Sequence, residues 1–151
     1  MRTLYEAAVA QEVKERIAQL RPQSVRQWGT MSAGQVIAHC AGGLETAVGD
    51  RVPPRGTFVG RMMGKIIKPL ALGNDRPMRK NSPTTEDLLV EGERDLAMER
   101  ERLCGLIDRF VAAGPGGCTT HPHTFFGKMT PEEWAELMYK HLDHHLRQFG
   151  V

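Results

Sequence analysis

The sequence has 151 residues, of which 40% are hydrophobic and 25% charged, and its formal net charge at pH 7 is +2. This length fits a single domain, residues 1–151, with enough chain to bury an apolar core. The small net charge singles out no polyanionic partner, so composition alone gives no reason to expect nucleic acid as a ligand.

No apolar run approaches the roughly 20 residues that cross a bilayer, so no membrane span is expected. The stretch MRTLYEAAVAQEVKER carries acids early and has no apolar signal core, and we therefore expect a cytoplasmic location. Cys40, Cys104 and Cys118 are an odd number of cysteines without the spacing of a disulfide framework. We predict three reduced thiols.

The first two predicted helices, residues 3–20 and 32–49, open with the same signal. Thr3 and Ser32 are each followed three residues later by glutamate or glutamine, which is the pattern of a capping box. Gly49 is expected to end the second helix. The first helix carries apolar residues at helical spacing, namely Tyr5, Val9, Val13, Ile17 and Leu20.

Residues 50–84 break the helical pattern, although their middle part, 59–72, could form a short helix. A third long helix is expected over residues 85–112 and a fourth over 130–149, where the sequence TPEE supplies a cap, a proline and a glutamate. The apolar stripe of the third helix is expected to contain Leu89, Leu96, Leu103, Ile107 and Phe110.

Four long helices with one apolar stripe each predict an all-α protein, specifically a four-helix bundle. The long connection between the second and third helices is the crossover of a bundle in which these two helices run parallel. We therefore expect an up-down-down-up topology.

Three histidines stand close together in KHLDHHLRQFG, residues 140–150. At 100° per residue, His141 and His145 lie on the axis of the apolar stripe of the fourth helix, and their spacing of four residues directs both rings toward one point. His144 falls on the edge of the stripe, and Asp143 is expected to face water. Such a pair can bind a metal, but hydrogen-bonded core histidines remain the alternative.

His39 lies on the second predicted helix, and Gly42 and Gly43 follow it about one turn later. Glycine inside a helix costs about 1 kcal/mol relative to alanine, so two together need a reason. Either the helices pack closely here, or space is left for a ligand beside His39. A histidine from this helix would complete a set of three nitrogen ligands with open positions, as in catalytic metal sites.

The segments RQWGTMSAGQVIAHC, residues 26–40, and HPHTFFGKMTPEEWAELMYKHLDHHLRQFG, residues 121–150, resemble an uncharacterised branch of the DinB-like, YfiT-like superfamily. Its pattern has one histidine in the second helix and an H-x-x-x-H pair in the fourth, with a glutamine three residues after the pair. The matching positions here are His39, His141, His145 and Gln148.

This resemblance implies an up-down-down-up bundle that binds a divalent metal, either zinc, nickel or iron, through the three histidines. Some characterised relatives transfer low-molecular-weight thiols, or act as hydrolases or isomerases on thiol adducts. Such a thiol is therefore a candidate cofactor. His144, Gln148, Gln35 and His121 are the residues expected to support the ligands or to line the pocket, unless the two amides are solvated or cap something local.

No catalytic residue can be assigned from the sequence, and Glu93 is a weak candidate for a base on the inward side of the third helix. Such a carboxylate more often flanks a helix seam and reaches solvent. Residues 51–80 hold eight basic residues against one acid, Asp75, and could attract an anionic substrate or membrane face unless the charges are simply solvated. Its MMGKIIK core could be a dimer-forming or membrane-touching segment.

The sequence thus favours a divalent-metal-dependent enzyme, a thiol S-transferase or hydrolase acting on a small electrophilic substrate. The alternative is a non-enzymatic bundle, with a structural metal or none, that binds a partner through the basic loop 51–80. No nucleic-acid-binding signature is present, so nucleic acid is not expected as a partner. A homodimer is left open, because the second helix has apolar residues on two faces.

Overall fold

The computed structural model describes all residues from 1 to 151, and it confirms that the protein is all-helical. There are two short 3-10 turns and no strand, and none of the helices is long and apolar enough to cross a membrane. The α-helices are α1 (Ala7–Gln19), α2 (Ala33–Ala47), α3 (Phe58–Ala71), α4 (Leu96–Ala113) and α5 (Pro131–Gln148), and the 3-10 turns are η1 (Glu86–Leu88) and η2 (Pro115–Gly117).

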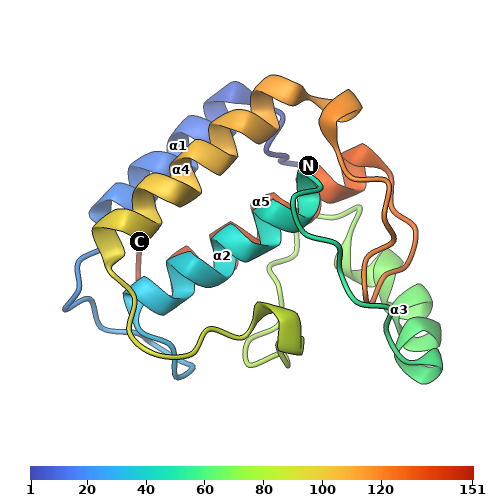
Figure 1. Cartoon of the computed structure of the whole chain (residues 1–151), viewed down its shortest axis with the longest axis horizontal. Helices are drawn as coiled ribbons and strands as arrows, with labels where there is room; N and C mark the ends of the chain where they lie inside the picture. Colours follow the sequence, from blue (N-terminus) through green and yellow to red (C-terminus); the bar gives the residue numbers. More distant parts are fainter.

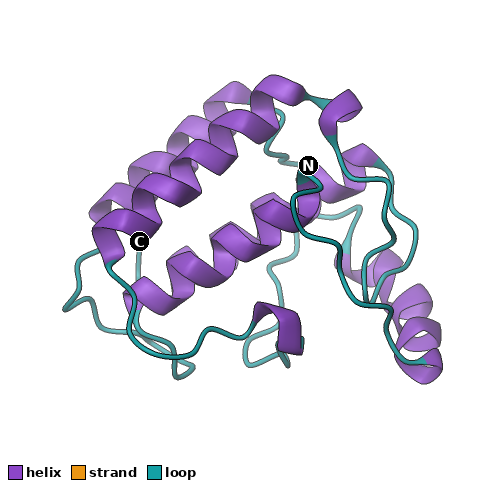
Figure 2. Ribbon diagram, viewed as in Figure 1, coloured by secondary structure: helices purple, strands orange, loops and turns teal.

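Four of the helices pack together, whereas α3 stands apart (Figures 1 and 2). Helix α2 lies against both α4 and α5, and α1 runs alongside α4 (Figure 1). The short helix expected within residues 59–72 is α3, and it projects from one end of the molecule on the long connection between α2 and α4.

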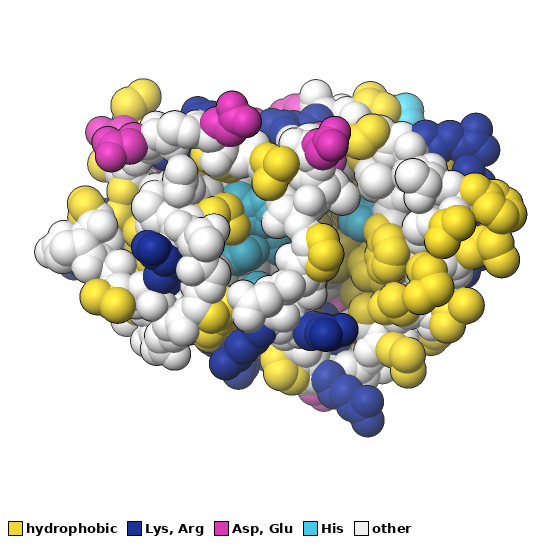
Figure 3. Space-filling model, turned by 90° about the horizontal axis from the view of Figure 1, so that it is seen from below, with side chains coloured by type: hydrophobic (Ala, Val, Ile, Leu, Met, Phe, Trp, Pro, Cys, Tyr) yellow, Lys and Arg dark blue, Asp and Glu magenta, His cyan; other side chains and the backbone are white.

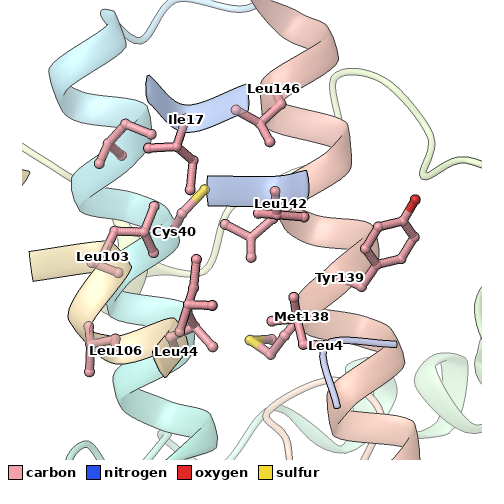
Figure 4. Packing of buried hydrophobic residues seen from close by; sticks show 14 of the residues in the cluster. Leu4, Ile17, Cys40, Leu44, Leu103, Leu106, Met138, Tyr139, Leu142 and Leu146 are labelled. Carbon is pink, nitrogen blue, oxygen red and sulfur yellow. The ribbon is translucent and has the colours of Figure 1, made fainter. Parts of the chain in front are cut away.

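One apolar core joins α1, α2, α4 and α5, as Figure 4 shows. Ile17, Leu44, Leu103 and Leu142 come from these four helices and are all at least 98% buried. Cys40 lies in the same core and is a free thiol, as are the other two cysteines. Burial of apolar side chains from all four helices is what holds them together.

Helices α2 and α5 begin where the capping signals predict. The Ser32 hydroxyl accepts a hydrogen bond from the Gln35 backbone N–H, and the Gln35 side chain accepts one from the Ser32 N–H. Thr130 and Glu133 make the same reciprocal pair at the start of α5. Each box satisfies two backbone donors that would otherwise lack a partner at a helix start.

The expected start of the first helix is wrong by four residues, since α1 begins at Ala7. Leu4 is fully buried, and its backbone N–H donates to the carbonyl of Ala135 in α5. This tertiary contact holds the segment before α1 out of helical conformation. The Thr3 N–H still donates to the Glu6 carboxylate, so one half of the expected capping box is present.

The expected third helix is also too long at its start, because α4 begins at Leu96 with Asp95 as its cap. Gly92 has φ of 72°, a left-handed conformation that ends any helix passing through it. Residues 85–95 therefore form η1 and extended chain, and Leu89 is 58% exposed. The placement of Glu93 on an inward helix face is wrong, since it lies exposed in this segment.

Helix α5 is covered on its polar side as well. Asp143 was expected to face water but is only 7% exposed, because it pairs with Arg16 of α1 and with Arg147, each at 2.8 Å. Further along the helix, the buried Lys140 donates to the carbonyl of Ala71. The connection after α3 and helix α1 thus enclose the polar side of α5.

Candidate metal centre

His39 of α2 and His141 and His145 of α5 form one cluster. One ring nitrogen from each lies within 4.8 Å of the others, and the ring centroids are 4.7 to 4.8 Å apart. The rings are tilted by 66° to 86° to one another, so they present edges rather than stacking. Two neighbouring helices therefore direct three imidazoles to one point.

A backbone carbonyl fixes the orientation of His39. Its Nδ1 is 2.9 Å from the oxygen of Leu88 in η1, which can only accept a hydrogen bond. Nδ1 therefore carries the proton, and the lone pair is on Nε2. This Nε2 lies 2.8 Å from Nε2 of His141.

His145 is oriented by a side-chain amide. Its Nδ1 is 2.8 Å from Oε1 of Gln148, and Nε2 of Gln148 donates to the carbonyl of Trp28. Because the Gln148 amide is held by Trp28, its oxygen faces the histidine and accepts the Nδ1 proton. His145 is thereby left with an unprotonated Nε2, as is His39.

The surroundings keep all three histidines uncharged. Burial lowers the pKa of His39, and burial together with the other histidines places the pKa of His141 well below its ordinary value. The pKa of His145 is lowered to about 3, mainly by burial and then by the repulsion that a second protonated ring would meet from His39. Neutral imidazoles are the form that binds a metal.

The nitrogens of His39 and His141 are already near the spacing found around a divalent ion. All three nitrogens lie within 4.8 Å of one another, so any wider pair must close on the ion. Ligand nitrogens about 2.1 Å from one ion lie roughly 3.0 to 3.4 Å apart, so the His39–His141 pair must open by a few tenths of an ångström. Without an ion, His141 would have to carry its proton on Nε2 and donate it to His39. The three histidines could thus hold a metal, and one hydrogen bond is the competing arrangement.

The cluster is buried but not sealed. His39 is 4% and His145 8% exposed, whereas His141 is partly exposed. Figure 3 shows histidine side chains at the bottom of an opening in the face seen from below. A small molecule could therefore reach histidines of this face from solvent.

A comparison with protein families places this sequence. Residues 4–150 match the model of a family described as a protein of unknown function, DUF1569. The chain belongs to the DUF1569 family. No curated protein and no solved structure matches it.

Two glycines of this DUF1569 member lie beside the cluster. A Cβ on Gly43 would be 3.4 Å from Nδ1 of His141, an ordinary van der Waals contact, so the ring does not require a glycine there. A Cβ on Gly42 would be 3.2 Å from the side chain of Leu88. Of the two glycines, only Gly42 is thus explained by close packing, against the side chain of Leu88 in η1.

The four residues expected around the cluster lie in four different places. Gln148 contacts His145, whereas the Gln35 amide caps α2 and donates to the carbonyl of Gly92. His121 is exposed in the loop before α5. His144 has its ring 5.0 Å from that of His145, and it lines a separate pocket of about 430 Å³ whose other lining residues include Trp28, Lys80 and Arg147.

Sequence reasoning missed the contribution of η1. Besides the Leu88 carbonyl, this turn brings the Asp87 carboxylate close enough for its charge to work against the lowered pKa of His39. Oδ1 of Asp87 is buried and has no hydrogen-bond partner. The signal that could have separated this segment from α4 is Gly92 followed by the capping residue Asp95.

Proposed function

We propose that this DUF1569 member is a divalent-metal-dependent enzyme in which His39, His141 and His145 bind one zinc, nickel or iron ion. The observation that carries the proposal is the hydrogen bonding of Nδ1 in His39 and His145, which leaves Nε2 of both rings free as a ligand. Metal-binding histidines usually donate their other N–H in this way. We also propose the up-down-down-up arrangement of DinB-like bundles for its four packed helices.

The proposed reaction is attack by a thiolate or a water on a small electrophilic substrate, as in a thiol S-transferase or a hydrolase. A divalent ion with three protein ligands supplies open positions, where it polarises a bound group or lowers the pKa of a water. Leu88 and Gln148 hold the two histidine rings in place. Among the three proposed ligands, only His141 is partly exposed.

A water loses a proton when it attacks, and a thiol must lose one to become the attacking thiolate; we assign the acceptance of this proton to Asp87. Its Oδ1 has no partner, and its charge acts on His39. A carboxylate oxygen that makes no hydrogen bond is free to accept a proton from a bound thiol or water. Asp87 replaces Glu93 as the proposed base, because Glu93 lies exposed on the far side of Gly92 from η1.

The alternative is a non-enzymatic protein with a structural metal or none, which binds a partner through residues 51–80. A structural site is closed by four protein ligands, whereas the enzyme needs an open position for a thiol or water. The histidine cluster offers three nitrogens and no fourth protein ligand, which favours the enzyme.

Cobalt(II) tests this directly, because a thiolate bound to cobalt gives an intense charge-transfer absorption. We expect the cobalt-loaded protein to gain this band when a small thiol is added, and to catalyse thiol transfer or ester hydrolysis in a substrate screen. His121→Ala is the matched control and should behave as wild type, whereas His145→Ala should lose the band. A cobalt spectrum that neither thiols nor azide alter would show a closed site and exclude the enzyme.

A further inference from the structure

Helix α3 exposes a continuous apolar face. Single exposed apolar side chains are ordinary in proteins, but a contiguous group of them marks an interaction site. Figure 3 shows hydrophobic side chains gathered at the end of the molecule where α3 lies in Figure 1. The helix contributes six large side chains that are 47% to 72% exposed: Phe58, Val59, Met62, Met63, Ile66 and Leu70.

The opposite side of α3 is fixed to the body of the protein. Gly64 is buried, and a Cβ there would be 1.7 Å from the carbonyl oxygen of Phe125, so the helix backbone rests directly on the turn before α5. Lys68 donates to the carbonyl of Lys128 and pairs with Glu133 at 2.7 Å. These contacts hold the apolar face outward.

The charged residues of α3 and of the chain on either side of it have one sign. The chain has no acidic residue between Asp50 and Asp75, whereas five basic residues lie in that interval. On a wheel at 100° per residue the apolar face covers about 140°, and Lys65 and Arg61 lie along one edge of it. A helix with an apolar face and a basic border is the type that lies in the surface of an anionic bilayer.

We propose that α3 is a peripheral membrane-binding helix that inserts its apolar face into an anionic lipid surface. A second copy of the chain fits less well, because a symmetric dimer through this face would set two positively charged segments against each other. Anionic headgroups would instead neutralise Arg61 and Lys65. The histidine opening is on the same face (Figure 3), so it would be turned toward the lipid.

Co-sedimentation of the full chain with vesicles tests the proposal. Wild type should bind vesicles of equal parts phosphatidylcholine and phosphatidylglycerol, and bind phosphatidylcholine alone much more weakly. Ile66→Asp, at a position 64% exposed, should lower the affinity for anionic vesicles by about tenfold or more with the helical content unchanged. Val25→Asp is the matched control, since Val25 is exposed outside α3, and it should bind as wild type.

Three results would overturn the proposal. One is no binding of wild type to the anionic vesicles. Another is vesicle binding that added salt abolishes but that Ile66→Asp leaves unchanged. The protein would then bind by surface charge alone, without inserting the apolar face. The last is a dimer in light scattering that Ile66→Asp dissociates, with no vesicle binding by either protein, which would assign the face to a second copy.

Discussion

His123 shows how a single side chain acquires a fixed role in a loop. Its Nδ1 accepts hydrogen bonds from the backbone N–H groups of Phe125 and Phe126, both at 3.1 Å, and its ring lies 5.4 Å from that of Trp134. Nδ1 must therefore be unprotonated in the folded protein. Burial lowers the pKa of His123 to about 4, consistent with a neutral ring.

Acidification should therefore destabilise the protein through His123. The unfolded chain takes up a proton near pH 6.5 but the folded ring only near pH 4, so this contribution is present above 6.5 and is lost as the pH falls to 4. Between pH 7 and pH 5, the free energy of unfolding of wild type should fall by about 1–2 kcal/mol more than that of His123→Gln, as measured by urea titration. An equal loss in both proteins would contradict this role.

For His141 and His145, the helical wheel was enough to predict that the side chains point inward, because both residues lie on the apolar stripe of α5. The wheel could not assign Gln35 and Gln148, since an amide serves equally well as a cap or as a partner for histidine. Only tertiary contacts separate them: Gln35 meets Gly92, and Gln148 meets Trp28 and His145.

Two helix glycines differ in what surrounds them. Gly105 in α4 has nothing within 4 Å of the place where a Cβ would stand, whereas a Cβ on Gly34 in α2 would lie 2.3 Å from the carbonyl oxygen of Arg94. No packing contact therefore requires glycine at position 105, where, relative to alanine, it only increases the conformational entropy that the chain loses on forming a helix. Gly34 is needed for the close approach of the chain before α4.

We predict that Gly105→Ala raises the free energy of unfolding by about 0.5–1 kcal/mol, because alanine is the better helix former and meets no neighbour. Gly34→Ala should lower it instead, because a backbone oxygen cannot move aside cheaply. Chemical denaturation of the two variants beside wild type measures both effects. A stabilising Gly34→Ala would show that the chain before α4 does not pack on α2.

The starts of α2 and α5 could be predicted because their capping boxes are local. The start of α4 could not be predicted from periodicity, since Leu89 and Leu96 fit one stripe although only Leu96 is buried. Gly92 and the Asp95 cap override that pattern locally. The prediction that Asp143 faces water was wrong for another reason. Its partner Arg16 comes from a distant helix, and no local sequence pattern reveals such a contact.

For the whole molecule, the long connection between α2 and α4 is part of the site. After α3 it passes α5, where Ala71 accepts a hydrogen bond from Lys140, and it then reaches α2, where Leu88 accepts one from His39. The length of this connection could be predicted from the sequence, but the helices that it contacts could not. The sequence was therefore enough to predict that His39, His141 and His145 lie together, but not which groups orient His39.

The central claim is that the three histidines bind one metal ion, and elemental mass spectrometry of the untagged protein tests it most directly. Wild type and the exposed-site control His121→Ala should contain about one ion per chain. His39→Ala and His141→Ala should lose it while circular dichroism shows the same helical content. No bound ion in wild type after reloading with zinc, nickel or iron, or an undiminished ion in His39→Ala, would contradict the claim.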